Sequence, residues 1–133
     1  MKDFKPETQA KNAIKWINEL TNYKQAEYEK RGKLGDEESG FCCLGAGCVI
    51  TGVAYDPKDF KSTEFTDKVG LISNLGAFTY PETLIHGERA LANLNDLTSI
   101  GFEGIAKVMR ENPEEIFFPE VAKLIKEAFK CSN

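Results

Sequence analysis

The residues of this chain best able to do chemistry are four cysteines and a single histidine, His86. Cys42, Cys43 and Cys48 lie within one short apolar stretch, and Cys131 lies far from them in the sequence. A zinc site usually combines paired Cys-x2-Cys spacings or several histidines, and the chain has neither pattern. A serine or cysteine nucleophile would need His86 beside it as a base, and no spacing brings such a pair together. We therefore expect no catalytic group, no metal and no cofactor.

The cysteines have a simpler interpretation as reduced structural thiols. A free cysteine behaves as a small buried hydrophobe, and the cytosol keeps thiols reduced. Metal ligation and a reactive nucleophile remain as less favoured alternatives. Asn95 and Asp96 also have two interpretations: they could bind a metal or ligand, but such a pair more commonly makes a turn and caps a helix.

Length, composition and charge limit the class of protein. The 133 residues suit one compact domain, so residues 1–133 are expected to form a single domain, and 41% hydrophobic residues can supply its core. The net charge of −4 argues against non-specific binding to DNA, RNA or anionic membranes. No apolar run approaches the roughly 20 residues of a membrane span, and no apolar signal-peptide segment opens the chain. A cytoplasmic protein is expected.

The apolar stretch from Gly40 to Gly52 is the segment around which the rest must be arranged, because it carries no charge. Such a segment is either a buried helix or a buried strand, and periodicity alone does not choose. Its length and the place of Gly52 as a C-terminal cap favour a helix over residues 41–51. Gly45 and Gly47 would each cost roughly 1 kcal/mol inside a helix. We therefore expect another backbone or a ligand to approach this helix closely.

The remaining segments favour an α+β fold class: a helix-dominated single domain with a few short strands. The expected helices cover residues 6–21, 41–51, a short segment capped by Ser62 and ended by Gly70, 88–97, a segment capped by Ser99, and a last segment from about Pro119. Residues 23–30 suit a short strand or extended segment, and residues 76–80 a second strand. Asn95 and Asp96 fall where the fourth of these helices is expected to turn into the next.

Several short motifs occur in a fixed order along the chain. They are Trp16, Tyr23-Lys24-Gln25, Phe41-Cys42-Cys43-Leu44-Gly45, Gly70-Leu71, Leu94-Asn95-Asp96 and Phe102-Glu103-Gly104-Ile105-Ala106. This ordered set resembles a small, mostly uncharacterised protein family that is common in bacteriophage genomes. The likeness spans Trp16 to Ala106, and it does not cover residues 72–87 or those after Met109.

Some phage proteins act as sponges: they bind cyclic nucleotide immune signals and keep them from the host's defence effectors. These proteins suggest a function for the family. The resemblance then implies an immune-evasion (anti-CBASS) protein of the infected host's cytoplasm, a homo-oligomer that sequesters a cyclic di- or trinucleotide without turnover. The expected ligand-binding residues are Tyr23, Lys24, Gln25, Arg31, Phe41, Cys42, Cys43, Gly45, Asn95 and Asp96. Aromatic rings among them would stack on bases, while cations and backbone N–H groups at a helix N-terminus would hold phosphate.

Two other functions stay open at this point. The first is a phage protein that inhibits a host enzyme by direct protein–protein contact through a surface patch. The second is a small hydrolase acting on nucleotides, which is the least favoured because the acid–base residues that it would need are missing from the sequence.

Overall fold

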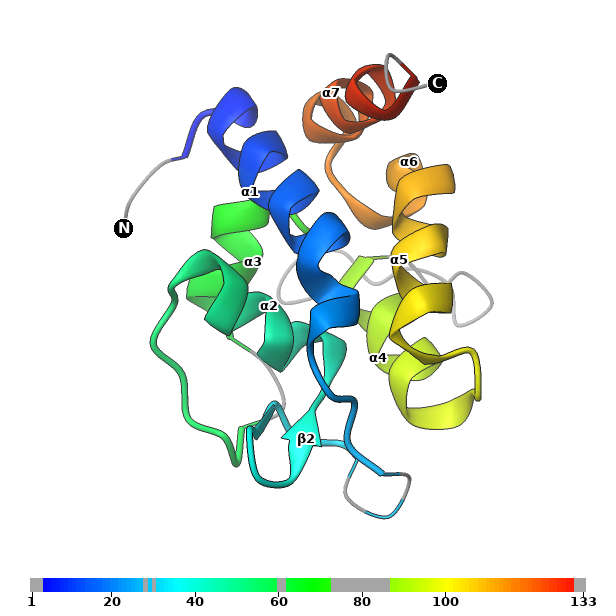
Figure 1. Cartoon of the computed structure of the whole chain (residues 1–133). Coiled ribbons are helices and arrows are strands. Elements are labelled where there is room, and N and C mark those ends of the chain that lie inside the picture. Colours follow the sequence, from blue (N-terminus) through cyan, green and yellow to red (C-terminus); the bar gives the residue numbers. More distant parts are fainter. Residues whose placement is uncertain (1–3, 28, 30, 60–61, 73–86, 131–133) are drawn as a thin grey trace.

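The structure is a computed structural model, and it describes residues 4–27, 29, 31–59, 62–72 and 87–130. These residues form a helix-dominated α+β fold with one two-stranded antiparallel sheet, as expected (Figure 1). The elements are α1 (Pro6–Glu19), the 3-10 helix η1 (Leu20–Asn22), β1 (Gly35–Asp36), β2 (Gly40–Phe41), α2 (Cys43–Thr51), α3 (Thr63–Val69), α4 (Gly87–Leu97), α5 (Gly101–Glu111), α6 (Pro113–Ile116) and α7 (Pro119–Lys130). The strand expected over 76–80 lies outside the described residues, as do Tyr28, His86 and Cys131.

The centre of the fold is α2, which contacts α1, α3 and α4. All of its residues are buried except Val49, as a helix that is apolar on every side requires. Gly52 ends it with φ +74°, and this confirms the predicted left-handed cap. The predicted start was two residues early, because Phe41 is extended instead: its N–H donates to Lys24 O and its carbonyl accepts from Ala26 N.

Trp16 of α1 joins three elements in the core. Its side chain is fully buried, and its ring packs edge-on against Phe65 of α3 with centroids 4.8 Å apart and planes at 86°. The indole Nε1–H donates to the carbonyl of Cys43 at 3.0 Å, so the polar atom of this buried ring is satisfied. The contact ties α1 to the first turn of α2.

Both ends of α3 follow the local sequence. The Ser62 hydroxyl accepts a hydrogen bond from the N–H of Phe65 at 3.3 Å, which is the predicted N-cap. Gly70 ends the helix in the left-handed region with φ +66°, and the buried Leu71 follows it. In the first part of the segment predicted over residues 23–30, residues 23–27 carry no helix, and Gln25 forms a parallel bridge to Phe41.

Two sequence predictions near α4 and α5 were wrong. The α4 helix runs through Asn95 and Asp96 to Leu97, so this pair does not form the turn that was expected. The N-cap of α5 is Ile100 rather than Ser99, and its side chain makes no capping hydrogen bond. The physical reason is that the helical backbone directs Asn95 into the core, where its side chain has polar partners. In the part of the chain that the structure describes, no helix is long and apolar enough to cross a membrane.

Candidate functional site

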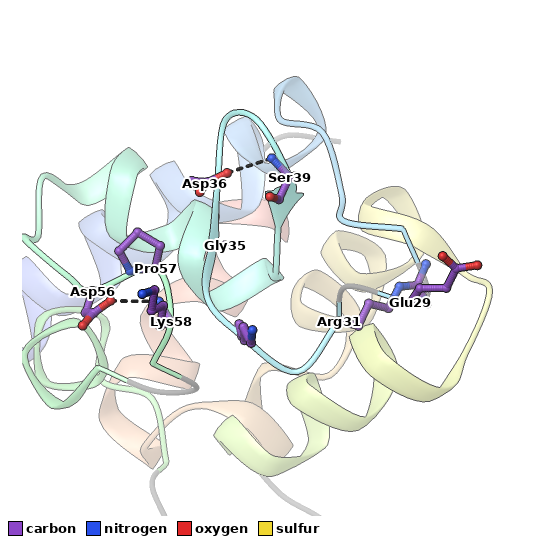
Figure 2. A pocket seen from close by; sticks show the side chains of 10 residues that line it. Glu29, Arg31, Gly35, Asp36, Ser39, Asp56, Pro57 and Lys58 are labelled. Atoms are coloured by element: carbon purple, nitrogen blue, oxygen red, sulfur yellow. Dashed lines mark hydrogen bonds between the residues drawn. The ribbon is translucent and has the colours of Figure 1, made fainter.

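A cleft of about 440 Å³, lined mainly by charged and polar residues, lies beside the β1–β2 hairpin. Three parts of the chain line it: residues 29, 31 and 33, the β1–β2 hairpin and the turn at residues 56–58 (Figure 2). The lining residues are Glu29, Arg31, Lys33, Gly35, Asp36, Ser39, Gly40, Asp56, Pro57 and Lys58. The volume falls within the roughly 300–1,000 Å³ of small-molecule sites, toward the small end.

The backbone of this cleft is held by hydrogen bonds between the hairpin and the facing turn. Gly35 N donates to Pro57 O at 3.0 Å, and the Tyr55 hydroxyl donates to Gly35 O at 2.9 Å. A side chain at Gly35 would overlap the backbone of Gly40, and both glycines have φ near +90°. The two turns that flank α2 in the sequence therefore meet in space on one side of it.

The cleft carries three cationic side chains, Arg31, Lys33 and Lys58, which can meet an anionic ligand. It also carries three carboxylates, and two of them build turns. Asp36 accepts from the N–H of Ser39 at 2.7 Å, and Asp56 accepts from the N–H of Lys58 at 2.9 Å. A ligand that binds here must therefore present anionic groups to the cations and donors to the remaining carboxylate oxygens.

Arg31 is fixed at one end of the cleft by backbone carbonyls. Its Nε donates to Ala26 O at 3.1 Å, and its Nη1 donates to Thr98 O at 3.0 Å. These bonds connect the segment after residue 26 to the end of α4. Because the guanidinium is held in place before any ligand arrives, its positive charge is pre-organised at the cleft.

Arg31 is the one residue of the ten predicted ligand residues that lines this cleft. Four others form a hydrogen-bond network centred on Asn95, whose side chain has no exposed surface. Asn95 Oδ1 accepts from Gln25 Nε2 at 3.0 Å and from Cys43 N at 3.2 Å, while Asn95 Nδ2 donates to Asp96 Oδ1 at 2.9 Å. In the structure these polar groups join α4, α2 and the extended segment to one another.

The N-terminus of α2 was predicted to offer its N–H groups to phosphate, and the structure corrects this. Cys42 N donates to Leu34 O at 3.0 Å, and Cys43 N donates to Asn95. Gly45 faces the backbone of Leu34, where a Cβ atom would overlap the carbonyl oxygen. The close backbone approach expected from the glycines of α2 is therefore found at Gly45, and protein occupies the place of the expected phosphate.

The aromatic residues predicted to stack on bases also contribute to packing. Phe41 is buried, and its ring packs edge-on against Tyr23 with centroids 5.7 Å apart. Tyr23 keeps a partly exposed edge, and Lys24 is exposed but does not line the cleft. Of these three, only Tyr23 and Lys24 have surface that a ligand could reach.

Sequence reasoning missed Lys33, Asp36, Ser39, Asp56 and Lys58 as site residues. A signal for them was present, since two polar turn sequences flank the apolar stretch on either side. A buried helix of nine residues spans only about 13 Å, at 1.5 Å per residue. Segments leaving its two ends can therefore meet on one side, as these two do.

The three described cysteines are free and buried, as predicted for structural thiols. Cys43 Sγ donates to the carbonyl of Leu91 at 3.7 Å. The side-chain interaction of the two neighbouring thiols lowers the pKa of Cys42 and, together with burial, raises the pKa of Cys43. Burial raises the pKa of Cys48 to about 12. Among the described residues, no group of three His, Cys, Asp or Glu side chains could hold a metal ion.

The raised pKa of Cys48 predicts a loss of stability at alkaline pH. Between the ordinary thiol pKa of 9.0 and about 12, the unfolded chain carries a thiolate while the folded chain keeps the proton. The free energy of unfolding should be unaffected by this group below pH 9 and should then fall by up to about 1.4 kcal/mol per pH unit. Urea denaturation from pH 8 to 11 measures the slope. Cys48→Ala should flatten it, and equal slopes in parent and variant would contradict the assignment.

Comparisons of the chain with protein-family models, with curated proteins and with solved structures give no match.

Proposed function

We propose that this protein binds a cyclic nucleotide signal in the cleft between the β1–β2 hairpin and the turn at residues 56–58. It holds the signal without turnover, as a phage immune-evasion sponge does. The observation that carries the proposal is the meeting of Arg31, Lys33 and Lys58 from two distant segments around one polar hollow. Cations of this kind neutralise phosphate, and the facing carboxylates can accept from the N–H groups of a base. The net negative charge of the chain is compatible with this, because a small anion responds to the local potential.

The lining of the cleft supports binding more than turnover. Ser39 brings a hydroxyl to the cleft, and the Asp36 carboxylate beside it accepts from the Ser39 backbone N–H. That bond shapes the hairpin turn and does not activate the hydroxyl for attack. The described cysteines are buried in the core away from the cleft lining. A ligand held here would meet charge and hydrogen-bonding groups without an arranged nucleophile and base.

Calorimetry against a panel of cyclic di- and trinucleotides tests the proposal with two variants. Lys33→Ala and Lys58→Ala should each weaken binding by about ten- to a hundredfold, the equivalent of one charge-assisted contact of about 1.5–3 kcal/mol. Both lysines are exposed, so these changes should leave the fold intact. Arg31→Ala is a poorer test, because it also removes the two bonds to backbone carbonyls.

The matched control is Lys126→Ala on α7, an exposed lysine that does not line the cleft, and it should bind as the parent does. Heat release of the ligand followed by chromatography should return the intact cyclic compound. A linearised product would make the protein an enzyme. Failure of the whole panel to bind would reject the sponge function.

A second function is favoured by a different observation: inhibition of a host enzyme by direct protein–protein contact. The side chains of Leu97 and Ile100 are 69% and 42% exposed, and both residues belong to the junction of α4 and α5. Contiguous exposed apolar patches often mark protein interaction surfaces. Co-purification of one host protein that is lost on Leu97→Glu would support this function.

A further inference from the structure

The formal charges that line the cleft beside the β1–β2 hairpin cancel, because its three cations are matched by three carboxylates. A phosphate that met these carboxylates without donors between them would be repelled. A ligand that binds here must therefore carry hydrogen-bond donors close to its anionic groups. The way in which the carboxylates are held indicates which donors these are.

Two of the carboxylates already accept a backbone N–H, so each is suited to one further donor. Asp36 accepts from the N–H of Ser39 at 2.7 Å, and Asp56 accepts from the N–H of Lys58 at 2.9 Å. A base edge with two parallel donors, such as that of guanine, is matched best by a carboxylate with both oxygens open. A single hydroxyl is the better match for Asp36 and Asp56, and ribose hydroxyls commonly donate to Asp or Glu.

Each of these two carboxylates shares its wall of the cleft with a lysine. Lys58 lies in the same turn as Asp56, and Lys33 closely precedes β1, which contains Asp36. Figure 2 shows Asp56 and Lys58 on the turn, with Asp36 on the facing hairpin. In a ribonucleotide the 2′-hydroxyl lies next to a phosphate, and it is the group by which proteins distinguish RNA from DNA. Each wall therefore supplies the complement of one ribose phosphate unit.

The described residues that line the cleft include no aromatic ring on which a base could stack. Tyr23 and Phe41, which were expected to hold bases, pack against each other and do not line it. Sites that bind bases without reading their edges generally use an aromatic platform. The volume of about 440 Å³ suits a ring of sugars and phosphates from which the bases project into solvent.

We propose that the cleft binds the ribose phosphate ring of a cyclic dinucleotide and leaves both bases in solvent. Asp36 and Asp56 each accept from a 2′-hydroxyl, while Lys33 and Lys58 each hold a phosphate. This assignment rests on the proposed function. It makes the protein a sponge that requires ribose and accepts different bases, and it favours a dinucleotide because each of the two walls matches one nucleotide unit.

Calorimetry with matched ligands tests the ribose requirement. Cyclic di-AMP and cyclic di-GMP should bind the parent within about threefold of each other, because the lining provides no stacking surface for either base. The 2′-deoxy counterpart of each should bind at least about tenfold more weakly, because it lacks the hydroxyls that donate to Asp36 and Asp56.

Three variants connect this preference to one carboxylate. Asp56→Ala should weaken binding of the ribose compounds by about tenfold and change binding of the deoxy compounds by less than about threefold. Lys33→Ala should weaken binding of both kinds equally, because both carry phosphate. Glu37→Ala is the matched control: Glu37 is an exposed acidic residue of the same hairpin, it does not line the cleft, and its variant should bind as the parent does. Asp56 is also exposed, and circular dichroism checks that its variant keeps the fold.

Equal affinity for the ribose and deoxyribose compounds would overturn the proposal, and so would an equal loss for both in Asp56→Ala. A preference for cyclic di-GMP that disappears in Glu29→Gln would overturn it as well, because the third carboxylate would then bind the guanine edge. If none of the cyclic dinucleotides binds, both the assignment and the sponge function on which it rests are rejected. Binding without a ribose preference would reject the assignment alone.

Discussion

Gly45→Ala should prevent stable folding or lower the melting temperature by roughly 10 °C or more. The added Cβ would overlap the carbonyl oxygen of Leu34 and lie 2.6 Å from its carbon. That neighbour is backbone, held where Leu34 N donates to Asp59 O and Leu34 O accepts from Cys42 N. Overpacking against side chains costs about 1–3 kcal/mol, and a backbone that cannot rotate away should put the cost at or above that range.

The control for this change is Gly104→Ala, another glycine inside a helix. Its added Cβ would lie 2.6 Å from Ile100 Cβ, so the backbone of Ile100, a 42% exposed residue just before α5, must shift. The gain in helix propensity of about 1 kcal/mol should offset part of that cost, so Gly104→Ala should lose less stability than Gly45→Ala. Thermal melts followed by circular dichroism compare the two variants. Equal melting temperatures for Gly45→Ala and the parent would mean that the Leu34 backbone does not press on α2.

Asn95→Ala should lower the free energy of unfolding by about 2–5 kcal/mol. The change leaves the buried Cys43 N and the half-buried amide of Gln25 without their acceptor, and it opens a small cavity where the fully buried Asn95 side chain lies. Buried donors that lose a partner cost far more than exposed ones, because water cannot replace it. Urea denaturation measures the loss.

Two further variants separate the polar network from simple loss of volume. Asn95→Asp keeps an acceptor for Cys43 but brings a second carboxylate against Asp96, so it should also destabilise, and more so at neutral pH than at pH 4. Asn93→Ala changes the same residue type on the same helix at a half-buried position, and it should cost less than about 1 kcal/mol. Similar losses for Asn93→Ala and Asn95→Ala would show that the buried hydrogen bonds of Asn95 do not add to stability.

Gly45 and Asn95 both act at the N-terminus of α2. Leu34 covers Gly45, and Asn95 satisfies the first N–H of α2, so both hold the N-terminus of this helix within the protein. The cleft lies beside the same hairpin, where Gly35 follows Leu34. Damage at either position should therefore reduce ligand binding through the fold, whereas Lys33→Ala should reduce binding with the melting temperature unchanged.

Local sequence by itself determined most of the helices of this protein. The uncharged stretch before Gly52 predicted a buried helix, and Ser62 and Gly70 predicted the two ends of α3, because caps and left-handed glycines act within a few residues. The need for close approach at Gly45 was also readable, since a glycine in a helix interior costs stability unless something uses the space.

The tertiary structure alone decided where the polar residues of the site lie. Asn95 was expected in a turn, but its hydrogen bonds with Cys43 and Gln25 make it a core residue of α4. Partners so distant along the chain cannot be recognised from the periodicity of the sequence. The N–H groups expected to hold phosphate bind Leu34 and Asn95 instead, for the same reason. Lys33 and Lys58 line one cleft because the backbone N–H groups of Leu34 and Gly35 donate to carbonyls of the turn after α2. Contacts between segments 25 residues apart depend on how the helices pack, and periodicity and capping signals report only on residues within a turn or two of one another.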